Sequence, residues 1–122
     1  LSLNGTNLSV DIVQPAIVKN CCFDDAVRFT RYAEERGKLV YPHFLGSAPG
    51  TAASAHLAAI ARVSHLEWDI NPNPLRTACF NGKFRATGGY LQLPSEPGLG
   101  WTLDMDAVEK WTIDTVVATP ET

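Results

Sequence analysis

The chain has 122 residues, of which 45% are hydrophobic and 19% charged, a composition that indicates one globular domain and excludes a disordered or collagen-like chain. Ten Lys and Arg against 13 Asp and Glu give a formal net charge of −3. The cations are dispersed, so no nucleic-acid partner is expected. The charge-free stretch Leu45–Ala61 contains Gly, Pro, Ser, Thr and His, so no membrane span or membrane partner is expected.

The three cysteines are Cys21, Cys22 and Cys79. Their number is odd, two of them are adjacent, and their spacing does not match a zinc site. We therefore expect buried free thiols in a reducing compartment, which indicates a cytoplasmic protein. The chain starts at Leu1 without a signal-peptide pattern, so we expect a processed or truncated chain.

The first predicted elements are a strand and a helix. Val10–Gln14 is rich in β-branched residues and is followed by proline, which indicates a short strand. Asp24 or Asp25 can cap a helix that runs to about Arg36, and Gly37 suits its left-handed C-terminal turn. The positions expected to be buried follow the helical spacing i, i+3, i+4 and i+7: Ala26, Phe29, Thr30 and Ala33.

A second strand is predicted at Leu39–Tyr41 and a third at Leu66–Asp69. Between them, Thr51 can cap a helix over Ala52–Val63, which is apolar nearly all round and so is expected to be buried against a sheet. Strands that alternate with helices through short connections predict adjacent parallel strands with right-handed crossovers. A three-stranded parallel sheet needs cover on both faces, so we expect a larger fold.

After about Leu75 the alternation of strand and helix patterns gives way to a tail of turn and loop signals. Turn signals at Gly88 and Gly89 precede a possible strand, Gly89–Leu93. Asp104 can cap a final helix over Met105–Trp111.

Ligands of parallel α/β proteins bind at the C-terminal ends of the strands. Lys19, His43 and Glu67 follow or end the predicted strands, and these residue types transfer protons to and from carbon. Each also has a structural interpretation: a solvated lysine, a strand-capping histidine, and a carboxylate that must be paired if it is buried. If Trp68 packs outward against helices, Glu67 points inward, and Asp69 shares its face and could serve instead.

Two further features are weaker signals. His56 lies in the middle of the alanine-rich helix, so a structural role is expected. The loop Phe44–Gly50 carries glycines before a helix start and could bind an anion, although such loops are common.

Four segments together resemble the C-terminal part of the mandelate racemase/muconate lactonizing enzymes of the enolase superfamily. They are DIVQPAIVKN, VYPHFLGSAPGTAASAHLAAI, LEWDINPNPLR and LPSEPGLGW. The resemblance implies an α/β fold in which residues 1–75 form the last three βα units, with strands six to eight, of a (β/α)8 TIM-type barrel. Residues 76–122 would form a C-terminal extension that packs toward the capping domain.

The resemblance also implies removal of the proton α to a carboxylate of a small hydroxy acid, with Mg²⁺ held by ligands upstream of this chain. By its place in the motifs, His43 would be the general acid/base and Glu67 would contact the substrate carboxylate or its enediolate. Lys19 would lie near the site. No metal ligand and no other cofactor-binding residue is expected within the chain itself.

Ala16 departs from the family pattern, which usually has an aspartate paired with the histidine. A histidine without that partner loses its orienting carboxylate, which favours a dehydratase (lyase) of a sugar acid or hydroxylated amino acid. The alternatives are a racemase or epimerase (isomerase), or an inactive structural or binding fragment, and the isolated chain is expected to be inactive. Expected partners are a small carboxylate substrate, the rest of the barrel, the capping domain, and further copies in a homo-oligomer.

Overall fold

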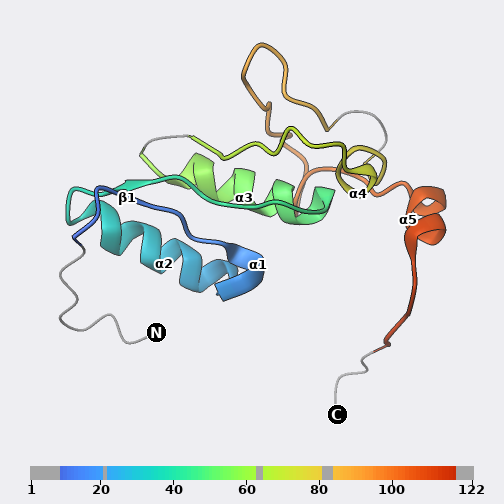
Figure 1. The fold of residues 1–122 in the computed structure, drawn as a ribbon, viewed down its shortest axis with the longest axis horizontal. Helices are drawn as coiled ribbons and strands as arrows, with labels where there is room; N and C mark the ends of the chain where they lie inside the picture. Colours follow the sequence, from blue (N-terminus) through green and yellow to red (C-terminus); the bar gives the residue numbers. More distant parts are fainter. Residues whose placement is uncertain (1–8, 21, 63–64, 81–83, 118–122) are drawn as a thin grey trace.

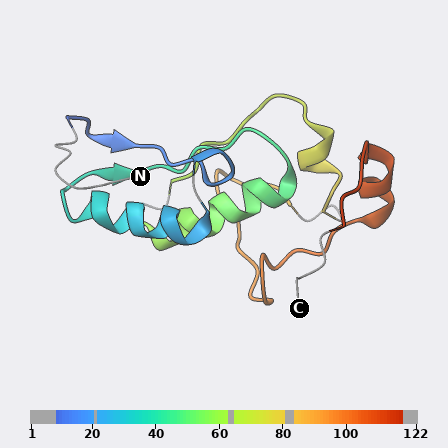
Figure 2. The same cartoon turned by 90° about the horizontal axis from the view of Figure 1, so that it is seen from below.

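The computed structural model describes residues 9–20, 22–62, 65–80 and 84–117. Two short parallel strands lie on one side of two longer helices, as the second view shows (Figures 1 and 2). No helix among these residues is both long and apolar enough to cross a bilayer. In chain order the elements are β1 (Ile12–Val13), α1 (Ile17–Asn20), α2 (Phe23–Glu34), β2 (Leu39–Val40), α3 (Ala48–Ile60), α4 (Pro74–Thr77) and α5 (Met105–Trp111).

The pairing of β1 with β2 confirms the predicted parallel arrangement of the first two strands. Val13 stands opposite Val40 in the register. The pairing continues past the strand ends, because the Tyr41 N–H donates to Val13 O at 3.0 Å and the His43 N–H donates to Pro15 O at 3.1 Å. The chain around His43 is thus fixed to the end of β1.

The predicted third strand, Leu66–Asp69, is wrong as a strand. The segment 65–70 runs parallel to the chain after β2 but joins it through one backbone hydrogen bond, from the Glu67 N–H to Pro42 O at 3.3 Å. The residues on either side of Pro42 donate toward β1, so the N–H of position 42 would face the segment 65–70. Proline has no N–H to give, and the ladder is interrupted there.

Helix α2 buries the predicted face, with Ala26, Thr30 and Ala33 inside and Phe29 partly buried. Its start differs from the prediction, because Cys22 is the N-cap and the two aspartates lie in the first turn. They still complement the positive end of the helix dipole there.

The end of α2 follows the prediction closely. The helix stops at Glu34, and Gly37 takes a φ of +71°. The Gly37 N–H donates to Glu34 O at 2.9 Å and the Lys38 N–H donates to Ala33 O at 3.0 Å. These two bonds form a Schellman motif, which needs a left-handed residue at the position of Gly37.

Helix α3 is buried as predicted but begins at Ala48, not Ala52, and ends before Val63. Ser47 is the N-cap, and a proline fits in the first turn because its missing N–H has no partner there anyway. Thr51 lies inside the helix and its hydroxyl donates to Ser47 O at 3.0 Å.

Glycines at positions 46 and 50 are explained by packing. The ring of Phe44, 8% exposed, lies against both. A Cβ added at Gly46 would stand 2.5 Å from the ring, and one at Gly50 would overlap it. The glycines of the loop Phe44–Gly50 therefore have a structural reason that requires no bound anion.

The tail is held on α3 by aromatic packing. Phe80, Phe84 and Trp101 form a cluster with centroid separations of 5.0 to 5.9 Å, and it packs on Ala48 and Ala52 of α3. Small side chains on the helix allow this close approach of large rings.

Three local predictions for the tail have different outcomes. Helix α5 has the predicted bounds, and the Asp104 carboxylate caps it by accepting the Ala107 N–H at 3.1 Å. The Gly88–Gly89 turn is confirmed, with φ of +59° and +83°. The predicted strand Gly89–Leu93 is wrong: around this turn the described part of the chain forms only the isolated Thr87–Tyr90 bridge, and residues 91–93 are not in a strand.

The cysteines divide into two environments. Cys79 is buried with a free thiol, as predicted, whereas Cys22 is free but exposed. The exposure of Cys22 corrects the prediction for that residue and follows from its place at the start of α2. Cys21 lies outside the described residues.

Candidate functional site

The strand pair has one face toward the helices and one face away from them. Val13 and Val40 are 8% and 1% exposed and pack with Ala33 of α2. Side chains alternate along extended chain, so Gln14 lies on the opposite face from Val13, and Tyr41 and His43 lie opposite Val40. The sequence thus directs Gln14 and His43 to the same face, near the C-terminal ends of β1 and β2.

The segment 65–70 follows the same alternation. Trp68 packs into the aromatic cluster on α3, with its ring centroid 5.9 Å from that of Phe84. Glu67 therefore points the other way, as expected from the sequence. On that face the ring of His65 also stands 5.1 Å from the ring of Tyr41.

Three side chains from three separate segments meet at one carboxylate. The Glu67 Oε2 atom lies 3.7 Å from His43 Nε2 and accepts a hydrogen bond from Gln14 Nε2 at 3.3 Å. The His43 and Glu67 side chains are 27% and 38% exposed, so both remain accessible to a small ligand. We call Gln14, His43 and Glu67 the polar cluster. The sequence named two of its members and missed Gln14, although the position of Gln14 at the end of β1 was a usable signal.

Lys19 is the third residue singled out in the sequence. It lies on α1, is exposed, and its backbone N–H donates to Ala16 O at 3.1 Å. Among the described residues its side chain makes no hydrogen bond or ion pair with the polar cluster. The structure therefore brings His43 and Glu67 together, and it shows no contact that joins Lys19 to them.

Asp69 is already engaged. Its carboxylate lies 2.8 Å from Arg76 Nη1, with the two side chains 10% and 7% exposed, and it accepts the Asn71 N–H at 2.9 Å. The bond from the Asn71 backbone, together with Arg76, lowers the pKa of Asp69 below its ordinary value of 3.8, against the opposing effect of burial. Asp69 therefore fixes the segment after Trp68 and is not a free substitute for Glu67.

His56 has the structural role that the sequence indicated. It lies on α3, and its Nε2 donates to the Leu99 carbonyl oxygen at 3.1 Å. Its ring stands edge-on to Trp101 with the centroids 6.0 Å apart. These contacts tie the tail to the helix, away from the polar cluster.

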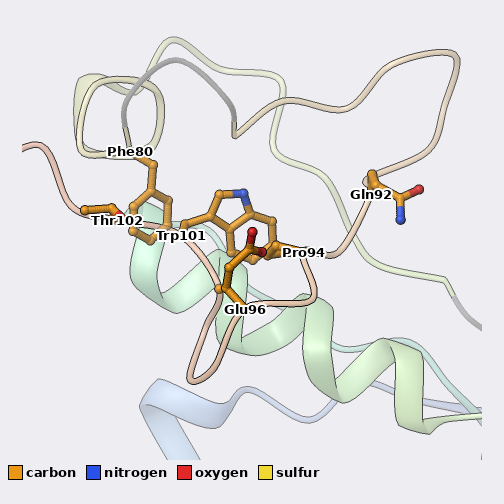
Figure 3. Close-up of a pocket in the computed structure, with 7 residues that line it drawn as sticks. Phe80, Gln92, Pro94, Glu96, Trp101 and Thr102 are labelled. Carbon is orange, nitrogen blue, oxygen red and sulfur yellow. The ribbon is translucent and has the colours of Figure 1, made fainter.

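A separate cavity of about 400 Å³ lies in the tail. Figure 3 shows Trp101 in the middle of its lining residues, with Phe80 on one side and Gln92 on the other. Among the described lining residues Glu96 is the one that can ionise, and neither His43 nor Glu67 borders this cavity. The polar cluster instead combines a histidine with a carboxylate at the ends of the strands, so we place the candidate site there.

The described residues do not fit a metal centre. No group of three or more His, Cys, Asp or Glu side chains in these parts of the chain could hold an ion. The polar cluster offers one carboxylate and one imidazole, whereas Mg²⁺ prefers a shell of oxygen ligands.

Comparison with known proteins finds relatives that each match most of this chain but only a part of their own length. The arabinonate dehydratase of Saccharolobus solfataricus is 25% identical over 103 residues, which cover 84% of this chain and 28% of that protein. The crystal structure of the 3,6-anhydro-D-galactonate cycloisomerase from Zobellia galactanivorans matches with a TM-score of 0.74 at 30% identity, over 84% of this chain and 29% of that one. A putative mandelate racemase from Bordetella bronchiseptica, crystallised with 2-oxoglutarate/phosphate, matches with a TM-score of 0.77 at 26% identity, over 88% and 29%.

The chain thus spans less than a third of the length of these relatives. The likeness to both solved structures supports an α/β fold of the TIM-barrel type. The sequence model of the family described as enolase C-terminal domain-like matches residues 6–107, which is most of the chain. The chain therefore belongs to the enolase C-terminal domain-like family and is a C-terminal part of an enolase-superfamily protein.

Proposed function

We propose that this chain belongs to a longer enzyme that removes the proton α to the carboxylate of a sugar acid or a related small hydroxy acid. The observation that carries the proposal is the polar cluster, in which His43 Nε2 and Glu67 Oε2 stand 3.7 Å apart and remain accessible. A histidine and a carboxylate at one face of a parallel strand pair are suited to proton transfer at carbon. The relative named arabinonate dehydratase supports a sugar acid as substrate.

In this proposal residues 1–75 are the last three βα units of the barrel, with the extended segment 65–70 in the position of the third strand, and residues 76–122 extend toward a capping domain. Parallel pairing of β1 and β2 supports the first part. The exposed apolar side chains after α5 support the second: Ile113 is fully exposed and Val116 and Val117 are more than 80% exposed. Apolar side chains gathered at such exposure indicate surface that another part of the protein covers. The rest of the barrel, the capping domain and further copies of the protein are the proposed partners, in the cytoplasm.

The chain's own residues suit elimination of a β-substituent. In dehydration the α-carbon loses its proton and the β-hydroxyl takes up a proton and leaves as water. We assign the removal of the α-proton to a base outside this chain. His43 Nε2 donates the proton that the leaving hydroxyl takes up. Glu67, whose Oε2 lies 3.7 Å from His43 Nε2, orients the imidazole. The superfamily's Mg²⁺ would be bound by residues outside this chain and would stabilise negative charge on the substrate carboxylate.

Dehydration is favoured over racemisation by the surroundings of His43. Ala16, 6% exposed, offers no acceptor for the histidine, and among the described residues the only carboxylate within 4.0 Å of it is Glu67. In a racemase the histidine exchanges a proton with the α-carbon on one face while a second group acts on the opposite face, and a firmly oriented partner assists that transfer. A histidine that only delivers a proton to a leaving oxygen needs less support.

Cycloisomerisation is the second candidate, and the match to the 3,6-anhydro-D-galactonate cycloisomerase favours it. In an anhydro sugar acid the group at the β-carbon is the ring oxygen. The same α-proton removal then opens the ring and no water is lost. The residues required of this chain are the same, with His43 protonating the ring oxygen.

The test is to incubate the full-length protein and Mg²⁺ in D₂O with arabinonate or with 3,6-anhydro-D-galactonate, and to follow both by proton NMR and mass spectrometry. A dehydratase gives a product that has lost water, a cycloisomerase gives an isomer, and a racemase gives α-deuteration without loss of mass. Unchanged spectra with both compounds and with a wider panel of sugar acids would contradict the proposal.

A further inference from the structure

Gln14 stands in a position that the proposed proton transfer leaves unexplained. It follows β1 directly, is exposed, and among the described residues its side chain makes one hydrogen bond, from its Nε2 to Glu67 Oε2 at 3.3 Å. The same oxygen is the one that faces His43 Nε2. One carboxylate oxygen is therefore shared between an amide and an imidazole.

The chemistry of these groups fixes the direction of the contact. A carboxylate carries acceptors only, so Gln14 must present its NH₂ group to Glu67. A hydrogen bond to a charged group is stronger than one between neutral groups. Gln14 therefore restrains the Glu67 side chain at Oε2, the same oxygen that faces His43 Nε2.

The restraint matters because the backbone of Glu67 is joined to the neighbouring chain at one point, while Trp68 and Asp69 anchor the segment to other parts of the structure. Its segment joins the chain after β2 by a single ladder bond, from the Glu67 N–H to Pro42 O. The Glu67 side chain can adopt several rotamers, and another contact must restrict them if the carboxylate is to keep one position relative to His43. Gln14, which comes from β1 and is joined to β2 by regular pairing, supplies a fixed reference point.

We propose that Gln14 is a positioning residue that acts through Glu67 and holds Oε2 of that carboxylate toward His43 Nε2. This inference rests on the proposed function of the polar cluster and adds to it a residue with no contact to the reacting atoms. We expect the 3.3 Å contact to shorten when substrate fills the site, as catalytic hydrogen bonds commonly do.

The test compares Gln14→Met with Gln92→Met in the full-length protein. Methionine keeps the length of glutamine and removes its donor. Gln92 is also exposed and lies in the tail, and within the described parts of the chain its Nε2 donates to the neighbouring Leu93 O alone, at 3.2 Å, so it is a matched control. We expect Gln14→Met to lower kcat about 10-fold, the lower end for a hydrogen bond to a charged group, with KM within about threefold, because the lost interaction is realised in the transition state. Gln92→Met should keep both constants.

A double-mutant cycle tests whether Gln14 acts through Glu67. In a Glu67→Gln background the additional change Gln14→Met should have less than half its logarithmic effect on kcat, since the carboxylate it serves is gone. Effects that multiply in full would overturn the proposal. Gln14→Glu, which keeps the size and solubility of the residue but cannot donate when ionised, must show at least the same loss, because its carboxylate also repels that of Glu67. It decides the matter if the methionine variant fails to fold.

A second readout does not depend on turnover. In protein with ¹⁵N-labelled histidine, the imidazole signal of His43, assigned with a His43→Asn variant, should move in Gln14→Met and stay in place in Gln92→Met. A wild type inactive on every sugar acid, together with a moved His43 signal, would reject the proposed function and keep the positioning. An active enzyme whose His43 signal and kcat are the same in both variants would reject the positioning alone.

Discussion

The packing of Phe44 against two glycines predicts the effect of Gly50→Ala. Gly50 lies in the first turn of α3 with an ordinary φ, so alanine can adopt its backbone, and helix propensity alone would favour alanine by about 1 kcal/mol. The added Cβ overlaps the Phe44 ring, and the same edge of that ring also lies against Gly46, with a Cβ position 2.5 Å away. Phe44 is 8% exposed, so the ring would have to shift within packed surroundings to make room. Overpacking of this kind costs about 2–3 kcal/mol, which leaves a net loss of about 1–2 kcal/mol.

The assay is urea unfolding of the full-length protein followed by tryptophan fluorescence, with Phe44→Leu as the background that removes the overlap. In that background Gly50→Ala should change sign and stabilise by about 0.5–1 kcal/mol. A stabilising Gly50→Ala in the wild type, or an equal destabilisation in both backgrounds, would refute the steric reasoning.

Three further predictions concern activity, pH and assembly. In the full-length enzyme His43→Asn should lower kcat by about 10²–10⁴-fold, and Lys19→Ala by much less because no contact joins it to the polar cluster; equal losses of turnover in the two variants would contradict this ranking. Asp69 has a lowered pKa, so its contribution to stability is present above pH 3.8 and is lost as the pH falls further through the folded-state pKa. Acid unfolding should therefore be steeper at that end in the wild type than in Asp69→Asn, and identical acid limbs would exclude the contribution. The isolated 122-residue chain, with Ile113 and Val117 exposed, should self-associate and bind ANS, whereas a sharp monomer peak in gel filtration without ANS binding would contradict this.

Local signals in the sequence located the helices better than the strands. Asp104 and Gly37 each act within one turn of their own position, so α5 and the end of α2 could be placed without knowledge of the rest of the chain. The start of α3 was misplaced because Thr51 is a good cap by type, while Ser47 with a following proline was the cap in fact. Two acceptable caps four residues apart cannot be ranked by propensity alone.

The missing third strand and the engagement of Asp69 depend on contacts between distant segments. Pro42 follows a plausible strand, and only the direction of hydrogen bonding from β2 shows that its absent N–H falls on the side of the segment 65–70. Arg76 is charged and would be expected at the surface, yet it is 6% exposed and pairs with Asp69. Helix α4, which carries Arg76, begins at an Asn-Pro pair whose capping role was a readable signal.

Because the ladder is interrupted beside Pro42, packing on the side of the segment 65–70 that faces α3 affects the position of side chains on its opposite side. The segment has one backbone hydrogen bond to the chain after β2. Its position is therefore set mainly by the packing of Trp68 in the aromatic cluster and by the Asp69–Arg76 ion pair. A change of volume under Trp68 therefore displaces Glu67, although the two side chains point in opposite directions. Substitutions outside the site can in this way change the distance between Glu67 and His43. During evolution such substitutions would change step by step the size of the substrate that fits between the two side chains.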